Sequence, residues 1–270
     1  MSRIRIGTPS HLATRPLVFG LTENPRNDIE LAYGEPGSLA LALDRGDLDA
    51  ALIPSIEFLR GVGKHAVNGP ALVARRPTGS LKLVANKPLP DVRSIAVDEF
   101  SRTTLVVLRV VLDKIYHVLP DFCVHKAFPF DSSWRDNHDG VLLDGDQGLR
   151  YCSGKIRPDE TCYDIDAMWF SLFPAPLVLS LWAYNDEHLK NVLEPALIQS
   201  RDAGVRNLPR ISGEMTRGSM YDKSFMHEFY HKAWGFNLGS EEEEGFLMLE
   251  RFARDYELLQ TSRLESALVG

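Results

Sequence analysis

The sequence predicts a two-lobed α/β protein in which mixed sheets are flanked by helices. Its 270 residues exceed the usual size of one domain, so two lobes of about 100–150 residues are expected. Short strand-like runs alternate with helical patterns, which is typical of βα units. With 44% hydrophobic and 25% charged residues, the chain can bury a substantial core. We expect lobe 1 to hold residues 1–84 and 184–270, and lobe 2 to hold residues 85–183.

Charge and apolar patterning narrow the class of partner. The net charge of −7 argues against nucleic acid or an anionic membrane as partner. The longest apolar stretch, Phe170–Ala183, is too short to span a bilayer and contains two prolines. The first ten residues, MSRIRIGTPS, lack the apolar run of a secretion signal. We expect a cytoplasmic protein with reduced cysteine thiols and a small-molecule ligand. The sequence does not indicate an oligomeric state.

Local patterns place the elements of lobe 1. Ser38 is a good N-cap and Gly46 is a standard residue just past a helix end, so a helix is expected over Leu39–Arg45. Pro54 ends the apolar strand that follows. The other expected elements are a strand over Arg3–Gly7, a helix with Pro16 near its start, and a strand over Ala50–Ile53.

The second lobe and the C-terminal part show the same alternation. The segment that begins at Ser101 is apolar nearly all round and predicts a deeply packed helix that ends near Tyr116. Glu241–Glu244 is expected to be the solvated first turn of a helix. The other expected elements are strands over Ser94–Val97, Val141–Leu143 and Leu177–Leu181, and helices from Tyr221 that are interrupted near Asn237–Gly239.

Taken in order, six stretches of this chain carry a resemblance to a known family. They are Ser10–Leu17, Ser38–Arg60, Ile95–Leu112, Asp139–Arg150, Tyr163–Ala183 and the helices after Phe236–Gly239. The most specific pieces are Ser101-Arg102-Thr103-Thr104 and the segment Ile53–Phe58, IPSIEF. Through these pieces the chain resembles the chorismate dehydratases, the first enzymes of the futalosine route to menaquinone.

The resemblance implies a type II periplasmic-binding-protein fold with a ligand cleft between the lobes. It also implies a lyase that needs neither a metal nor an organic cofactor. Chorismate, a dicarboxylate, would lose water to give 3-enolpyruvylbenzoate. The ring proton beside the enolpyruvyl ether leaves together with the neighbouring hydroxyl, and the ring becomes aromatic. Such an enzyme mainly has to hold the dianion in one pose and help a proton to leave.

A dianionic substrate requires two anion-binding elements. The helix start at Ser101, Arg102, Thr103 and Thr104 is one candidate, since backbone N–H groups and hydroxyls can bind a carboxylate there; capping and packing are the alternative. The other candidate substrate-binding residues are Arg15, Ser55, Ser80, Gly145 and Asp146. The alternatives are a surface ion pair for Arg15 and a turn-forming carboxylate for Asp146. The loop before Ser80, Arg75-Arg76-Pro77-Thr78, departs from the family's Ser-Asp-Gly-Pro.

The candidate catalytic residues are Glu57, His11 and Thr14. Glu57 can orient substrate or take a proton, or it can accept hydrogen bonds from the unpaired N–H groups of a first helical turn. The family usually has an asparagine where this chain has Ala13. Three explanations stay open: His11 or Thr14 covers that role, the substrate's own carboxylate takes the proton, or the protein binds without dehydrating. His11 can also be simply a packed histidine.

Two other classes of function compete with the lyase. Residues 227–231, HEFYH, match the H-E-x-x-H pattern in which His227 and His231 bind zinc, and Glu250 has the spacing of a third ligand. The motif lies close to the end of this sequence, which leaves little chain for a peptidase substrate domain. A non-catalytic binding protein of the same fold is the other alternative.

Overall fold

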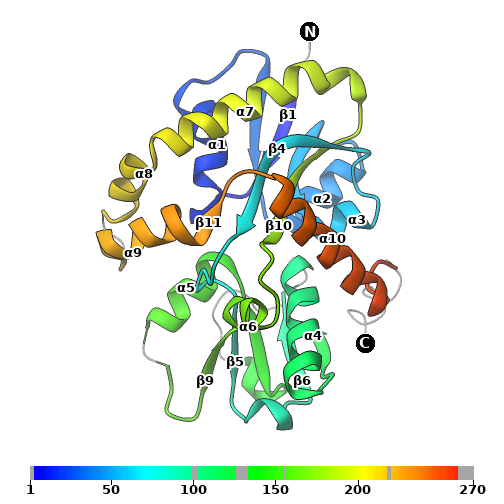
Figure 1. The fold of residues 1–270 in the computed structure, drawn as a ribbon, viewed down its shortest axis with the longest axis vertical. Coiled ribbons are helices and arrows are strands. Elements are labelled where there is room, and N and C mark those ends of the chain that lie inside the picture. Colours follow the sequence, from blue (N-terminus) through cyan, green and yellow to red (C-terminus); the bar gives the residue numbers. More distant parts are fainter. Residues whose placement is uncertain (1–2, 99–101, 126–132, 155, 218–219, 261–270) are drawn as a thin grey trace. The chain divides into compact units, whose positions relative to one another are not determined.

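The fold is described from a computed structural model, which covers residues 3–98, 102–125, 133–154, 156–217 and 220–260. The chain forms two compact units. Residues 1–76 and 175–248 make up unit 1, and residues 77–174 and 249–270 make up unit 2. Each unit contains one mixed sheet flanked by helices, as the sequence predicts (Figure 1).

Unit 1 is built on a six-stranded sheet in the order β11-β4-β10-β3-β1-β2. Strands β1, β2 and β3 are parallel, whereas β10 runs antiparallel to both β3 and β4. The strands are β1 (Ile4–Thr8), β2 (Ile29–Tyr33), β3 (Ala50–Pro54), β4 (His65–Ala74), β10 (Leu177–Tyr184) and β11 (Trp234–Gly235).

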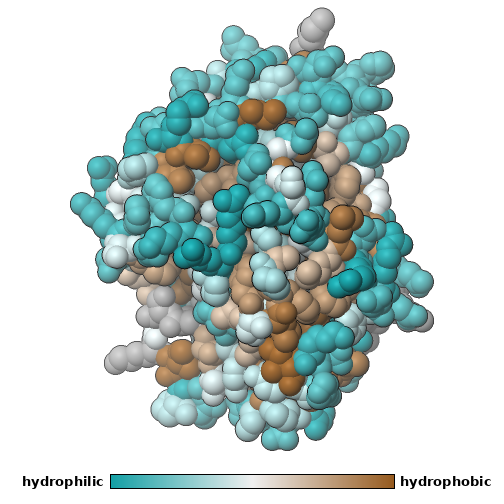
Figure 2. Space-filling view, in the orientation of Figure 1, coloured by the Kyte–Doolittle hydropathy of each residue, from teal (hydrophilic) through white to brown (hydrophobic). Residues whose placement is uncertain are grey.

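The helices of unit 1 follow the strands or pack beside them. They are η1 (Leu12–Thr14), α1 (Arg15–Glu23), α2 (Pro36–Asp44), α3 (Ser55–Leu59), η4 (Glu187–Leu189), α7 (Lys190–Arg206), α8 (Leu208–Met215), α9 (Lys223–Glu228) and the π-helical turn η5 (Phe229–Ala233). Helix α10 (Ser240–Asp255) begins in unit 1 and ends in unit 2. The visible face of unit 1 is largely hydrophilic (Figure 2).

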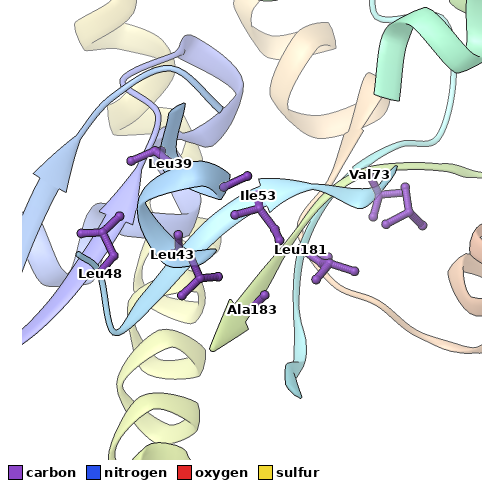
Figure 3. Packing of buried hydrophobic residues seen from close by; sticks show 11 residues of the cluster. Leu39, Leu43, Leu48, Ile53, Val73, Leu181 and Ala183 are labelled. Carbon is purple, nitrogen blue, oxygen red and sulfur yellow. The ribbon is translucent and has the colours of Figure 1, made fainter. Parts of the chain in front are cut away.

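The core of unit 1 lies between α2 and the sheet. Leu39 and Leu43 on α2 pack with Ile53 of β3, Val73 of β4 and Leu181 of β10 (Figure 3). Every residue of β3 and β10 is buried, which explains why both strands are continuous apolar runs rather than alternating ones. This packing anchors β3, whose carboxyl end leads into α3.

Unit 2 is built on a five-stranded sheet in the order β7-β6-β8-β5-β9. Strands β6, β7 and β8 are parallel, and β5 is antiparallel to β8 and β9. The elements are β5 (Lys82–Ala85), η2 (Leu89–Asp91), β6 (Ser94–Val97), α4 (Arg102–Tyr116), β7 (Asp121–Val124), η3 (Ser133–Asp136), β8 (Gly140–Leu143), α5 (Gly145–Ser153), β9 (Thr161–Asp164) and α6 (Ile165–Leu172).

The boundaries of the units differ from the predicted division at 84/85 and 183/184. Strand β5 pairs with β8 and β9 and so belongs to unit 2, whereas β10 pairs with β3 and β4 and belongs to unit 1. The last described residues belong to unit 2, because Phe252 packs on Trp169 and Phe173 and the Tyr256 hydroxyl bonds to Asp113. Sheet pairing, which local patterns do not reveal, decides these boundaries.

Three local predictions are wrong. Ser38 is not an N-cap, because α2 already begins at Pro36, whose fixed φ suits a first helical position. The predicted solvated turn Glu241–Glu244 is exposed at three of its residues but not at Glu242, which exposes 3% of its surface and accepts two bonds from Arg75. Cys162 is not a reduced thiol, because it forms a disulfide, whereas Cys123 is free. The predicted break at Gly46 is confirmed, with a φ of 78° just past α2.

Candidate functional site

The predicted catalytic residues lie at one edge of the unit 1 sheet. Because β1 and β3 are parallel neighbours, their carboxyl ends meet at the same edge. His11 and Thr14 follow β1, and Ser55 and Glu57 follow β3 in the first turn of α3. Arg15 is exposed at the start of α1, on the same β1 connection. Residues that are 40 or more positions apart in the sequence therefore share one edge, which is where ligands bind in open α/β sheets.

His11 is paired with a carboxylate at this edge. Its Nε2 lies 3.6 Å from Oε2 of Glu35, the residue that precedes the first turn of α2. The interaction with His11 lowers the pKa of Glu35 more than partial burial raises it, so the Glu35 carboxylate is the charged partner. A carboxylate beside an imidazole stabilises its protonated form, which is what a proton acceptor needs. His11 is half-buried rather than packed away.

Thr14 shapes the turn that carries His11. Its hydroxyl lies 2.9 Å from the carbonyl oxygens of both Pro9 and His11 and donates to them, and the residue is 2% exposed. The hydroxyl proton is thus engaged with the backbone. Ala13 next to it is also buried and carries no polar group. Of the two proposed replacements for the family's asparagine, His11 retains a side chain that can exchange a proton.

The side chains of Glu57 and Ser55 form hydrogen bonds within unit 1. The Ser55 hydroxyl donates to the Val178 carbonyl at 2.7 Å, and Ser55 is fully buried. Glu57 Oε1 accepts from Arg60 Nη1 at 2.7 Å, and the two side chains are 11% and 2% exposed. Because the Glu57 carboxylate is buried and held by Arg60, this geometry favours a structural role for Glu57.

Most of the predicted substrate-binding residues lie at one edge of the unit 2 sheet. Strands β6 and β8 are parallel, and β9 runs in the same direction because both it and β8 are antiparallel to β5. Helices α4, α5 and α6 each begin just after one of these strands, so three helix N-termini lie along one sheet edge. Unpaired N–H groups and the positive end of the helix dipole favour anions there.

The predicted residues occupy two of these helix starts. Arg102 is the first residue of α4, and Thr103 and Thr104 in the same turn are 3% and 5% exposed. Ser101 lies outside the described residues. Gly145 opens α5 with a φ of 54°, and Asp146 is half-buried in the first turn.

Ser80 lies against the start of α5. A Cβ at Gly148 would come within 2.2 Å of the Ser80 carbonyl oxygen, so only glycine allows this approach. The Ser80 side chain is 1% exposed, and its Oγ lies 2.5 Å from Oγ1 of Thr78. Thr78 Oγ1 in turn lies 2.5 Å from Oδ2 of Asp166, and the Thr78 N–H donates to the same oxygen at 2.6 Å. Asp166 comes from the first turn of α6.

Thr78 and Asp166 are functional candidates that sequence reasoning missed. The residues lie 88 positions apart, and no local pattern connects them. An aspartate in a first helical turn predicts a solvated side chain, yet Asp166 is fully buried. The departure from the family's loop before Ser80 was the available signal, because it brings a hydroxyl, Thr78, beside Ser80.

The pKa values of Asp164 and Asp166, two neighbouring aspartates in this cluster, are shifted in opposite directions. Lys82 Nζ lies 2.6 Å from Asp164 Oδ2, and the Ala167 N–H donates to the other Asp164 oxygen at 3.1 Å. Burial raises the pKa of Asp164, but its bonds to Asp166 and Lys82 together lower that pKa by more. The net pKa of Asp164 is therefore below its ordinary value. Burial and the neighbouring Asp164 raise the pKa of Asp166 well above the usual range. Asp166 therefore keeps its proton to higher pH than Asp164 does.

The raised pKa of Asp166 predicts a loss of stability at rising pH. The folded protein keeps the Asp166 proton at pH values where the unfolded chain, with a pKa near 3.8, has released it. The contribution of Asp166 to the free energy of unfolding should therefore fall as pH rises from about 3.8 to the folded pKa, and then level off. Urea denaturation across this range should show wild type losing stability relative to Asp166→Asn. Asp91→Asn, which removes an exposed carboxyl of the same unit, should behave like wild type in this comparison.

The alternative zinc set does not form a site. The rings of His227 and His231 stack with centroids 4.3 Å apart, and both residues are exposed. Glu228 pairs with Lys232 at 2.6 Å and Glu250 pairs with Arg254 at 2.6 Å. Within the described ranges, no group of three or more His, Cys, Asp or Glu side chains is arranged to hold a metal ion.

Comparison with solved structures defines the class of protein by its fold. A protein from Archaeoglobus fulgidus, AF1704, has a TM-score of 0.71 at 16% identity, covering 95% of this chain and 98% of its own. The alkanesulfonate-binding protein SsuA from Xanthomonas axonopodis pv. citri, bound to MOPS, has a TM-score of 0.61 at 16% identity, with 99% and 98% covered. The periplasmic aliphatic sulphonate binding protein SsuA from Escherichia coli has a TM-score of 0.59 at 13% identity, with 97% and 94% covered. The chain therefore has a periplasmic-binding-protein-like fold.

The family is shown by a match over nearly the whole chain. A family model described as "Menaquinone biosynthesis" matches residues 4–255. This chain belongs to that family, which is the chorismate dehydratase family indicated by the sequence resemblance. No helix among the described residues has the length and apolar character needed to cross a membrane. The cytoplasmic location expected from the sequence stays a prediction.

Proposed function

We propose that this protein is a chorismate dehydratase that converts chorismate to 3-enolpyruvylbenzoate in menaquinone biosynthesis. The observation that carries the proposal is the edge of the unit 2 sheet that carries the starts of α4, α5 and α6, with Ser80 against the start of α5. Membership of the menaquinone biosynthesis family supports the pathway. The solved neighbours named as sulfonate-binding proteins support an anionic small-molecule ligand.

Each unit by itself carries groups that can bind a carboxylate. In unit 2, helix N-terminal amides supply donors without adding a titratable cation, and Thr103 and Ser80 add hydroxyls. In unit 1, Arg15 is exposed and offers a guanidinium that matches a carboxylate. We propose that unit 2 binds a carboxylate more tightly, because helix starts lie along one sheet edge there.

The proton step is assigned to His11. When the ring proton beside the enolpyruvyl ether is removed, the C–H electron pair forms the new ring double bond and the neighbouring C–O bond breaks. The departing hydroxide takes a proton back from the imidazolium and leaves as water, and aromatisation drives the step. His11 accepts this proton, and Glu35 at 3.6 Å stabilises the imidazolium that forms. In this assignment His11 takes the role of the asparagine that the family usually has at the position of Ala13.

Incubation of the purified protein with chorismate tests the proposal by mass spectrometry. A product lighter by one water, formed in proportion to protein concentration, is expected. Thr103→Ala, which removes one hydroxyl at the start of α4, should weaken chorismate binding by about 1–3 kcal/mol. Chorismate that binds but stays intact would instead identify a non-catalytic binding protein, which the buried Ala13 would explain.

A further inference from the structure

Two histidines of the H-E-x-x-H segment stay close together although they form no zinc site with Glu250. His227 lies in the last turn of α9, and His231 lies in η5, which continues directly from α9. Because four residues separate them, the two side chains leave the helical backbone on the same side. Their rings stack with centroids 4.3 Å apart and an interplanar angle of 26°, and both residues are exposed. The stack therefore presents two imidazoles side by side to solvent.

The backbone that carries the two histidines is held by buried neighbours. Met226, Phe229 and Tyr230 are all buried, and the Tyr230 hydroxyl donates to the Leu12 carbonyl at 2.8 Å. Turn η5 is π-helical, a rare conformation that is often found at functional sites. Helix α9, orange in Figure 1, lies at the periphery of unit 1. The two imidazoles thus stand on a fixed platform, so little conformational freedom is lost when both bind one ligand.

The spacing of the rings fits a metal ion bound by both. Two nitrogens at about 2.0–2.1 Å from one tetrahedral ion lie about 3.3 Å apart. The centroids of the His227 and His231 rings are 4.3 Å apart, so a small rotation of the exposed side chains brings one nitrogen of each ring to that separation. Imidazole nitrogens suit Zn²⁺, Cu²⁺ and Ni²⁺, whereas Mg²⁺ and Ca²⁺ prefer oxygen ligands. The pair therefore favours a transition-metal ion.

The charged groups around the pair are engaged with one another. Glu228 pairs with Lys232 at 2.6 Å and also interacts with Arg76, and Glu250 pairs with Arg254 at 2.6 Å. Within the part of the chain that the structure describes, no third His, Cys, Asp or Glu side chain joins the two histidines to form a metal-binding group. An ion held here has two nitrogen ligands from the protein and lacks the unengaged glutamate that H-E-x-x-H hydrolysis uses as a base.

We propose that His227 and His231 form a two-histidine chelate for a divalent transition-metal ion, with water in the remaining coordination positions. Affinity follows the order in which Cu²⁺ binds more tightly than Ni²⁺ or Zn²⁺, and Mn²⁺ binds most weakly. The site is separate from the proposed function, because neither histidine takes part in the binding or conversion of chorismate.

Calorimetric titration with Ni²⁺ tests the proposal. Ni²⁺ is the probe because it does not oxidise the free Cys123 thiol. Wild type should bind Ni²⁺ at a saturable site, and His227→Ala and His231→Ala should each weaken that binding by about 10²-fold, because the second imidazole acts as an intramolecular ligand. His188→Ala, which removes another exposed histidine of unit 1, should bind as wild type does. Binding that does not saturate, or that both variants retain, would overturn the proposal.

Thermal unfolding separates a chelate held by the fold from two histidines that merely lie close in sequence. An ion that binds the folded chain in preference to the unfolded chain raises the midpoint of unfolding. Saturating Ni²⁺ should raise Tm in wild type and in His188→Ala more than in His227→Ala, and Mg²⁺ should change none of them. Equal Ni²⁺ shifts in all three proteins would contradict the chelate. Neither measurement involves chorismate, so failure of the proposed function would leave this site standing.

Discussion

Replacing His11 by alanine is expected to lower kcat for chorismate dehydration by about 10²–10⁴-fold, the usual contribution of a general base. Thr14 next to it has its hydroxyl engaged by two backbone carbonyls, and Ala13 has no polar group, so neither can take over the proton. KM should change less than kcat, because the anion-binding groups are untouched. Steady-state kinetics that follow product formation measure both constants.

Glu35→Gln provides the matched comparison for His11. It removes the carboxylate 3.6 Å from His11 Nε2 but keeps the side-chain shape, so kcat should fall less than in His11→Ala. An unchanged kcat in His11→Ala would contradict the assignment and would point to the substrate's own carboxylate as proton acceptor.

Replacing Glu57 by alanine is expected to destabilise the protein by about 3–5 kcal/mol. Arg60 is 2% exposed, and its Nη1 lies 2.7 Å from Glu57 Oε1. Removal of the carboxylate takes the Glu57 charge away from a buried guanidinium, and the loss of this attraction costs free energy. The free energy of unfolding from chemical denaturation gives the difference.

Glu228→Ala is the control for this stability effect. Glu228 also pairs with a cation in the same unit, but its side chain and that of Lys232 are 54% and 51% exposed. Its removal should change stability by less than about 0.5 kcal/mol. A Glu57→Ala variant as stable as Glu228→Ala would show that the pair is not held in the core. Full turnover by Glu228→Ala would also argue against H-E-x-x-H chemistry, in which this glutamate is the base.

Much of the fold could be predicted from local sequence patterns. Ser94–Val97 forms a strand with the predicted bounds, and the apolar segment before Tyr116 forms one long helix. These elements are long, apolar or bounded by clear stop signals. Strand β5 shows why other parts could not be predicted: its place is decided by pairing with β8 and β9, distant in the sequence. The partner of Glu242, Arg75, is likewise 167 residues away.

The candidate site could be predicted only where a residue follows a strand that ends in a helix start. Thr103 and Gly145 were predicted in this way, since strand–helix junctions are visible in the sequence, whereas His11 was predicted from the family resemblance. Sequence alone could not separate a ligand-facing role for Glu57 from an ion pair, because the decisive partner, Arg60, is one of many nearby charges. Asp166 was missed because its burial depends on the packing of α6 against β5.

Proton NMR of chorismate in the presence of the wild-type protein tests the central claim most directly. We predict that the ring signals of chorismate disappear, aromatic signals replace them, and the enolpyruvyl vinyl signals persist, since dehydration leaves that ether intact. Unchanged chorismate signals at high protein concentration, or free pyruvate in place of the vinyl signals, would contradict the account.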